Sequence, residues 1–448
     1  MMLYKLNLNK NIKLIEVIRL AFPVALQSAL VAVLALADVL MVSDFGQEAT
    51  AAVGIASKWH FVAIMVMAGL ATANGTLVAQ YWGKEDKAKA KSITFIAIRF
   101  GLLVMVPTTL ILTLGSNWLM RLQTSDLIVI TLGSDYLWYA LPLLILTHIV
   151  IVVESTLRSS GDAITPLIIG SITIVLNIVL NYWFIKGGLG VPAMGVAGAA
   201  LATTISRIVQ LILIYAILTF RSHWLLCSNY GEVSVGKFRG LAVPLALNSI
   251  LWALGTMSYQ MIFGHMGTTE LAVFSLLSPF ESLCYSLFFG LSVACSVIIG
   301  NMLGRQEFDD ALSTSADFIK YVMVLGGTCG FLLYLIKDTV IELLGLNQPD
   351  LLSIASPALT ILSVAITLRM TNMIIINGSL RAGGDNQFCL KMDLFAMWVI
   401  GIPLCALAAY AFGFGFTTVF AMMLVEELIK LALCGWRYQQ QRWLNDLT

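Results

Sequence analysis

Long runs of apolar residues, separated by short polar segments, dominate the chain. A helix that crosses a bilayer needs about 20 mostly apolar residues. Twelve such runs can be placed, roughly over residues 14–42, 50–82, 92–115, 130–156, 164–186, 195–220, 238–264, 270–303, 312–336, 350–379, 388–412 and 414–436. The strands of a membrane barrel would be about 10 residues long with alternating polarity, so the pattern excludes that architecture. The sequence predicts an all-α polytopic membrane protein with twelve transmembrane helices.

The second half of the chain repeats the first at an offset of 221 residues. This offset places Pro23 on Pro244 and Gly69 on Gly290, and LRSSGD (157–162) returns as LRAGGD (380–385) at an offset of 223. Because each repeat unit holds six helices, both copies enter the membrane from the same face, as in parallel repeats. We therefore predict two pseudo-symmetric six-helix lobes, residues 1–220 and 238–448, joined by a cytoplasmic linker at 221–237.

Composition and charge support a membrane protein and give its orientation. Hydrophobic residues make up 59% of the chain and charged residues 11%, whereas about a quarter of residues are charged in soluble proteins. Lysine and arginine gather at the N-terminus, after every second predicted span and at the C-terminus. The positive-inside rule then places both termini in the cytoplasm, which requires an even number of spans. The seven cysteines show no CxxC spacing and the four histidines lie far apart, so neither a disulfide framework nor a metal site is indicated.

The repeated LR-x-x-GD element has a structural interpretation. We expect Arg158 and Arg381 to meet helix-terminal carbonyls, the glycines to allow a turn, and Asp162 and Asp385 to cap the following helices.

Several motifs together resemble the multidrug and toxic compound extrusion (MATE) family. The resemblance rests on LRSSGDAITPL after the fourth span, NIVLNYWFI and GVPAMGVAGAALATTISR across the fifth and sixth, and QYWGKED at the end of the second. It covers nearly the whole chain and is most specific over residues 177–207. It implies a V-shaped pair of lobes that exports amphipathic, often cationic, compounds by alternating access, driven by inward H⁺ or Na⁺. We expect a monomer in the bacterial inner membrane, with drugs and the lipid bilayer as partners and no nucleic acid.

Asp38 is the carboxylate that interrupts the first predicted span. An acid at the centre of a membrane helix costs about 2.5–3.5 kcal/mol on insertion scales and usually marks an ion or proton pathway. At about 1.5 Å per residue, Asp38 lies roughly 8–10 Å below the outer end of its helix near Gly46. Gln27, eleven residues earlier, is predicted to share its helix face. The alternative is an aspartate at the outer interface that only meets a lysine or solvent.

The two halves differ at the position of this carboxylate, because the repeat aligns Asp38 with Tyr259. We therefore expect ion handling in the N-terminal half. Resemblance to the DinF-type branch of the family implies that Asp38 acts with two asparagines, at i and i+4 on one helix face, and with a threonine of the sixth span. A tyrosine of the fourth span is a further candidate. The coupling candidates are Asp38, Asn177, Asn181, Thr203 and Tyr139.

The coupling ion is expected to be H⁺ rather than Na⁺, with no other cofactor. The NorM-type branch would show a glutamate in the seventh helix and an aspartate in the tenth, but VPLALNSILWALG and LRMTNMIIINGSL contain no carboxylate. Some relatives also carry a second aspartate where this chain has Asn181. A Na⁺ site of either kind is therefore not indicated, although Na⁺ stays an alternative.

Other polar residues in the predicted spans have weaker interpretations. Gln27, Tyr136 and Glu281 are candidates to line the substrate lumen, and Glu281 is equally compatible with a structural hydrogen bond. Glu154 is expected near the cytoplasmic end, solvated or paired with Arg158. We expect three charged residues of the last span, Glu426, Glu427 and Lys430, to anchor it near the inner interface. We assign no role to Lys58, His60 and Arg369.

Competing functions lack the residues that they require. A flippase for lipid-linked oligosaccharides would need a strongly basic central cavity. An intramembrane enzyme would need a catalytic pair or a cluster such as HExxH, and a channel would need a filter-like repeat. The sequence also has no Walker A pattern. The sequence thus favours a secondary antiporter that is not an enzyme.

Overall fold

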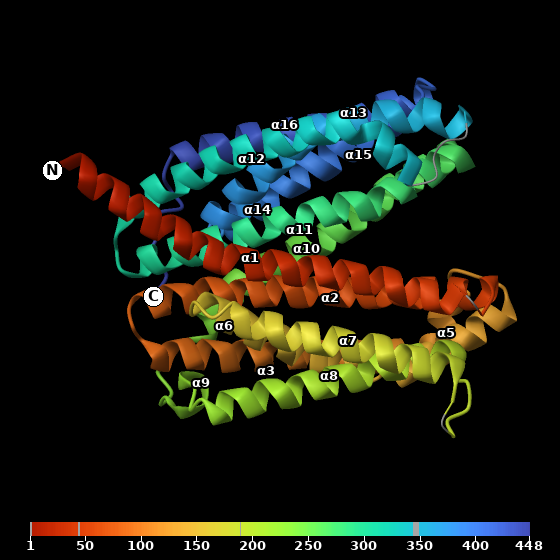
Figure 1. Cartoon of the computed structure of the whole chain (residues 1–448), viewed down its shortest axis with the longest axis horizontal. Helices are drawn as coiled ribbons and strands as arrows, with labels where there is room; N and C mark the ends of the chain where they lie inside the picture. Colours follow the sequence, from red (N-terminus) through yellow and green to blue (C-terminus); the bar gives the residue numbers. More distant parts are fainter. Residues whose placement is uncertain (1, 44, 189, 344–348) are drawn as a thin grey trace. The chain divides into compact units, whose positions relative to one another are not determined.

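The computed structural model describes residues 2–43, 45–188, 190–343 and 349–448, and helices make up most of them (Figure 1). The chain forms two compact units. The N-terminal unit is Leu26–Ala246, and the C-terminal unit combines Met1–Ala25 with Leu247–Thr448. Two long helices, α1 (Met2–Ser43) and α10 (Val235–Met266), therefore contribute to both units. The predicted linker at 221–237 lies within the N-terminal unit.

The remaining helices of each unit follow one another along the chain. Those of the N-terminal unit are α2 (Gln47–Gly83), α3 (Lys87–Leu114), α4 (Ser116–Arg121), α5 (Leu127–Tyr139), α6 (Leu143–Ser159), α7 (Ile164–Lys186), α8 (Gly195–Phe220) and α9 (Trp224–Cys227). Those of the C-terminal unit are α11 (Thr268–Gly304), α12 (Phe308–Leu343), α13 (Pro349–Met373), α14 (Asn386–Asp393), α15 (Ile402–Ala406) and α16 (Phe416–Gln439). Three π-helical segments interrupt the C-terminal unit: η1 (Ile374–Leu380), η2 (Leu394–Gly401) and η3 (Leu407–Ala411).

Most of the expected spans are present as long apolar helices. Within the described chain, ten helices are long and apolar enough to cross a membrane, or eleven if α5 and α6 form one span bent by 50°. Pro142 lies at this bend, directly before α6, and proline cannot donate the backbone hydrogen bond that would continue a helix. The twelfth expected span corresponds to α16, which is too polar to qualify because its middle carries Glu426, Glu427 and Lys430. The fold is that of an all-α polytopic membrane protein.

The predicted repeat explains why each unit takes the beginning of a helix from the other half of the sequence. In the N-terminal unit, Gly69 of α2 lies against the start of α10, where an added Cβ would come within 2.7 Å of Ala246. In the C-terminal unit, Gly290 of α11 lies against the middle of α1, where a Cβ would come within 2.8 Å of Ala25. The repeat relates these two contacts, since it matches Gly69 with Gly290 and Ala25 with Ala246. Glycine permits this close helix approach in both units.

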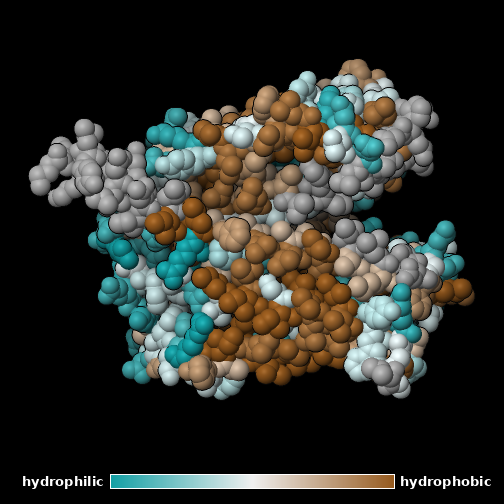
Figure 2. Space-filling model, in the orientation of Figure 1, coloured by the Kyte–Doolittle hydropathy of each residue, from teal (hydrophilic) through white to brown (hydrophobic). Residues whose placement is uncertain are grey.

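The surface of the N-terminal unit shows where lipid would contact it. Figure 2 shows an apolar middle with hydrophilic surface at both ends of this unit. The outward residues of α7 recur every three or four positions, as expected for one face of a helix. They are Ile164, Ile168, Ile172, Val175, Val179 and Tyr182, all exposed.

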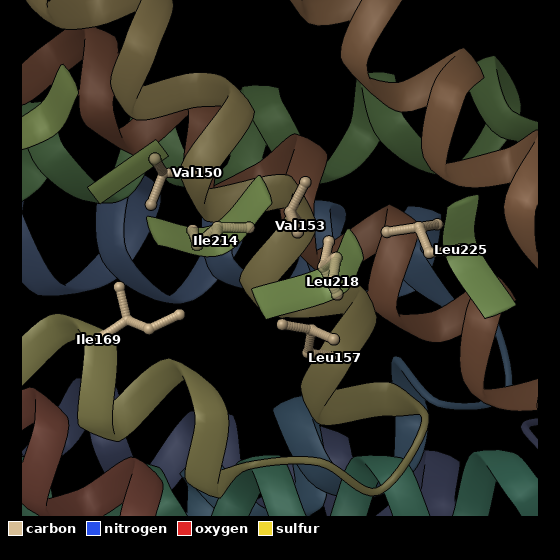
Figure 3. Close-up of a cluster of buried hydrophobic side chains, with 7 residues drawn as sticks. All are labelled: Val150, Val153, Leu157, Ile169, Ile214, Leu218 and Leu225. Atoms are coloured by element: carbon tan, nitrogen blue, oxygen red, sulfur yellow. The ribbon is translucent and has the colours of Figure 1, made fainter. Parts of the chain in front are cut away.

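Inside the same unit, α6, α7, α8 and α9 share a buried apolar cluster (Figure 3). Because packed apolar side chains of this kind hold helices in a fixed register, the cluster fixes how the polar residues of α6, α7 and α8 face one another. Its members are Val150, Val153, Leu157, Ile169, Ile214, Leu218 and Leu225.

The two LR-x-x-GD elements behave differently. In the first, Gly161 adopts a φ of 91°, and the Asp162 carboxylate accepts a hydrogen bond from the Thr165 amide at 3.0 Å near the start of α7, as expected. In the second, Gly384 adopts a φ of 80°, but Asp385 makes no side-chain cap at α14. The Asp385 carboxylate instead receives two bonds from Arg437 of α16, at 2.5 and 3.0 Å. The expected second cap is therefore wrong, because a guanidinium occupies this carboxylate.

The arginines of these elements also differ from expectation. We expected helix-terminal carbonyls as their partners, but their partners include side chains. Arg158 donates to Gln27 and Glu154, and Arg381 donates to the Asn248 side chain at 2.6 Å. Two long basic side chains can thus be used for tertiary contacts where the sequence alone indicates local ones.

Candidate functional site

Asp38 lies half-buried on α1 and faces α7. Its carboxylate accepts a hydrogen bond from Asn181 Nδ2 at 2.5 Å, and Asn181 itself is fully buried. The alternative of an interfacial aspartate that meets only lysine or solvent does not describe this contact. A carboxylate bonded to a buried amide is positioned by the protein interior.

Asn181 links Asp38 to further polar side chains through hydrogen bonds. Its Nδ2 also donates to Asn177 Oδ1 at 3.0 Å, and Asn177 Nδ2 donates to Thr203 Oγ1 at 3.3 Å. Thr203 in turn donates to the backbone carbonyl of Ala199 at 3.0 Å. The structure thus brings together four of the five coupling candidates on three helices, α1, α7 and α8. The i, i+4 spacing of the asparagines places both on the face of α7 that meets α8.

The tyrosines of α5 lie in two different environments. Tyr136 packs its ring against His60 at a centroid distance of 5.9 Å, and it interacts electrostatically with Asp38. Tyr139 ends α5 with an exposed side chain, and its backbone carbonyl accepts a bond from Thr204 at 3.1 Å. Of the two tyrosines, Tyr136 is therefore the one with a described interaction with Asp38, although we expected Tyr139 to act with this carboxylate.

A second polar group surrounds Glu154 of α6. This carboxylate is buried, with 6% of the residue exposed, and it accepts bonds from Gln27 Nε2 at 3.1 Å and Gln210 Nε2 at 3.0 Å. Arg158 pairs with it at 3.4 Å, as the i, i+4 spacing predicts. The expectation of a solvated or simply paired glutamate is thus too simple, because tertiary contacts bury it. Gln27 belongs to this group and has no recorded bond with Asp38, although the two share a helix.

Arg207 of α8 lies between the two polar groups. Its Nη1 donates to Gln210 Oε1 at 2.6 Å, and its charge interacts with both Asp38 and Glu154. Thr203, Arg207 and Gln210 are spaced i, i+4 and i+7, which places them on one face of α8. The polar residues from Asp38 to Glu154 therefore form one track along this face, which we call the α8 track. We missed Arg207 and Gln210 in the sequence, although their spacing from Thr203 was a signal that could have found them.

The C-terminal unit has a charged interior of its own. Tyr259, the repeat counterpart of Asp38, donates to Glu426 of α16. Glu426 pairs with Lys430 at 2.6 Å, as its spacing predicts, and Lys430 also lies 3.5 Å from Asp393. Both Glu426 and Lys430 are buried, so the expectation that they anchor α16 at the inner interface is wrong. The C-terminal unit has no carboxylate at the position that aligns with Asp38. Glu426 supplies one beside Tyr259, from α16, a helix that the repeat does not match to α1.

Arg369 and Glu281 form an ion pair in the same unit, and Arg369 also approaches Glu427 at 3.6 Å. Glu427 accepts a further bond from Asn372 at 2.8 Å. This arrangement gives Arg369 a partner and supports the structural interpretation of Glu281. Lys58, by contrast, is an exposed residue of α2.

The described residues contain no group of three or more His, Cys, Asp or Glu that could hold a metal ion. The chemistry available around Asp38 is that of one carboxylate, neutral amides, hydroxyls and a guanidinium. Such a set can bind and release a proton or a cationic group and can change its hydrogen bonds when it does so.

An all-helical membrane chain built from a six-helix repeat, with a polar track inside one unit, defines a polytopic membrane transporter. The MatE family model matches residues 23–183 and 244–407. The protein belongs to the MATE family, a family of transporters.

Relatives and solved structures agree with this assignment. The chain is 26% identical to the probable multidrug resistance protein YoeA of Bacillus subtilis over 80% of this chain and 78% of that protein. It is 23% identical to the uncharacterized transporter YisQ of the same organism, over 97% and 96%. A mutant of the Vibrio cholerae MATE transporter VcmN has the same fold, with a TM-score of 0.86 at 19% identity, over 95% and 96% of the two chains.

Proposed function

We propose that this transporter exports amphipathic, cationic organic compounds in exchange for protons that enter the cell. Several relatives carry the name of multidrug resistance protein, which supports the substrate class. The bond between Asp38 and the buried amide of Asn181 supports the place of ion coupling. Any such coupling requires that the proton bind two conformations of the carrier with different affinities.

The amide of Asn181 offers a physical switch for this difference. Its Nδ2 serves two acceptors, Asp38 and Asn177, while its buried Oδ1 has no hydrogen-bond partner among the described residues. A proton on Asp38 turns one carboxylate oxygen into a donor. Rotation of the Asn181 amide then presents Oδ1 to that donor and turns Nδ2 away from Asp38. The position of a single proton is in this way transmitted from α1 to α7.

The rest of the α8 track responds to the same charge. When Asp38 is ionised, it attracts both Arg207 and a cationic substrate, and such attraction is stronger in a site of low dielectric than in water. Protonation removes the negative charge, so the cationic substrate loses its counter-charge and is released. Substrate and proton thus compete for one carboxylate, which gives exchange without a second ion.

The hydrogen-bond pattern favours H⁺ over Na⁺. Na⁺ would need several oxygen atoms directed at it, as hard cations do. Asn181 instead directs an N–H group at Asp38. A carboxylate that accepts from an amide is suited to proton exchange, and its neighbours are not arranged as cation ligands.

Transport of a fluorescent cationic dye into everted vesicles tests this function. We expect dye movement that follows an imposed pH gradient, is insensitive to a Na⁺ gradient, and is abolished by Asp38→Asn. The matched control is Asp135→Asn, which changes an exposed aspartate of α5 and should transport normally. Dependence on Na⁺ alone, or unchanged coupling in Asp38→Asn, would refute the proposal.

A further inference from the structure

A groove of about 400 Å³ lies in the N-terminal unit between α3 and the segment that leads into α10. We call it the α3–linker groove. Ser92 and Gly231 are two of its lining residues. Apolar and aromatic side chains form most of its wall, and one cationic side chain faces it. The remaining lining residues are Phe95, Ile96, Arg99, Tyr230, Val233 and Val235.

Specific contacts hold the linker wall of this groove in place. Lys91 of α3 is buried and donates to the backbone carbonyls of Leu226 and Ser228 at 2.9 and 2.8 Å. Its ammonium also lies 4.5 Å from the centre of the Tyr230 ring. Ser92 and the backbone of Gly231 exchange two hydrogen bonds, at 2.7 and 3.0 Å. The groove is therefore a built feature of the folded unit.

The groove carries an excess of positive charge. Arg99 is exposed, and no ion pair or hydrogen bond is recorded for its guanidinium among the described residues. Arg239 is exposed as well and lies one helical turn beyond Val235 on α10, so it shares the face of that groove residue. The recorded hydrogen bonds of Lys91 are to carbonyl oxygens, which do not cancel its charge. Glu232, between the lining residues Gly231 and Val233 in the sequence, adds one exposed negative charge.

The depth of the groove matches a membrane interface. The rings of Phe100 and Phe238 are in contact at 5.8 Å, so Arg99 lies level with the first turns of α10. The predicted apolar spans of α3 and α10 begin at residues 92 and 238, so Arg99 lies seven residues, or about 10 Å, inside the first of them. Beyond this level lie the basic residues that the charge pattern assigns to the cytoplasmic side. An arginine at this depth is placed to reach lipid phosphates.

We propose that the α3–linker groove binds an anionic phospholipid of the inner leaflet. Arg99 and Arg239 contact its phosphate group, since guanidinium groups bind phosphate oxygens in pairs, and an acyl chain covers Phe95, Val233 and Val235. Basic pockets between membrane helices on the cytoplasmic side are known to hold lipid headgroups. A free phosphate would gain nothing from the apolar wall, and a neutral lipid would gain less from the two arginines. A bound lipid would thereby join α3, the linker and α10.

Native mass spectrometry of the full-length protein in detergent tests this assignment, with phosphatidylglycerol and phosphatidylcholine as probes. We expect a phosphatidylglycerol adduct that is at least about fivefold weaker in Arg99→Gln or Arg239→Gln, because each cation near a lipid surface contributes about that factor. The matched control is Arg121→Gln, an exposed arginine of α4 outside the groove, which should bind as the wild type does. Val233→Glu, which adds a negative charge inside the groove, should also weaken the adduct.

The competing outcomes are distinct. Equal binding of the two lipids, or full binding by both arginine variants, would overturn the proposal. Displacement of phosphatidylglycerol by inorganic phosphate at equal concentration would show an anion site without lipid specificity and would also overturn it. Thermal unfolding of each variant without lipid distinguishes lost binding from misfolding.

Discussion

Arg207 and Glu154 are joined by a single side chain. The guanidinium donates to Gln210 Oε1 at 2.6 Å, and Gln210 Nε2 donates to Glu154 Oε1 at 3.0 Å. The amide therefore accepts from the cation through its oxygen and donates to the anion through its nitrogen. Because Arg207 also interacts with Asp38, this pair connects the proposed coupling carboxylate to a second buried acid.

Gln210→Met should interrupt the α8 track while keeping a side chain of similar length. Glu154 then loses one of its recorded donors, and a buried acceptor without its partner costs about 1–3 kcal/mol. We expect a lower melting temperature in detergent and slower dye export. The pH at which export is half-maximal should also shift, because Arg207 loses its hydrogen bond to Gln210 and its position relative to Asp38 and Glu154 changes. An unchanged pH profile at reduced stability would mean that the track is purely structural.

Asn181→Leu should uncouple Asp38 from α7 and leave the carboxylate itself in place. The variant removes the bonds to Asp38 and Asn177 together. We expect dye binding, measured by equilibrium fluorescence, to survive within about thirtyfold, because two lost bonds at roughly 1 kcal/mol each amount to about 2 kcal/mol. Proton-driven export should fall to the background of Asp38→Asn. Asn117→Leu, which changes an asparagine that bonds Ser134 outside the track, is the control. Export at the wild-type rate in Asn181→Leu would contradict the switch.

Tyr259→Phe tests whether the charged interior of the C-terminal unit takes part in coupling. The substitution removes the hydroxyl that donates to Glu426, but Lys430 still pairs with this carboxylate. We expect a loss of about 1–3 kcal/mol in stability, seen as a lower melting temperature, with the dependence of export on the pH gradient intact. Loss of that dependence in a folded variant would place coupling in both units.

His223, in the linker outside the spans, should make the N-terminal unit less stable in acid. Its Nδ1 accepts a bond from the Leu225 amide at 3.3 Å at the start of α9, which requires the neutral ring. Burial lowers the pKa of His223 below its ordinary value, against an opposing effect of Asp162. The unfolded chain therefore binds the proton more readily, so this stabilisation is present above the ordinary histidine pKa of about 6.5 and is lost as the pH falls below it.

Melting temperatures between pH 8 and pH 5, compared with His223→Asn, provide the measurement for this prediction. Asparagine can also accept a bond from the helix start but does not titrate in this range. The difference between the two proteins should change with pH below about 6.5. Parallel curves would show that this histidine does not contribute to the pH dependence.

Much of the fold is predictable from the sequence, for physical reasons that act locally. A bilayer demands long apolar helices, so the runs of residues locate them directly. The spacing of Asn177 and Asn181 places both amides on one face of one helix, and the resemblance to the MATE family adds Asp38 and Thr203. The repeat is also visible in the sequence, where Gly69 aligns with Gly290. In the structure these two glycines make the same kind of close helix contact, one in each unit.

The partners of most charged side chains are decided by the tertiary structure. Gln27 and Asp38 share a face of α1, but eleven residues separate them by about 16 Å along the helix axis. They therefore bond to different groups, Glu154 and Asn181. The packing of α6, α7 and α8, fixed by their shared apolar cluster, decides this division.

The last helix shows the same limit of sequence reasoning. Its charges look like interfacial anchors when α16 is considered alone, yet Glu426 and Lys430 are buried beside Tyr259 and Asp393. Periodicity gives the angular position of a residue on its own helix. The depth, the rotation and the neighbours of that helix depend on contacts between segments far apart in the chain. The sequence by itself therefore determined the helices, the repeat and the acid of α1, and only the packing of those helices decided which partners each buried charge has.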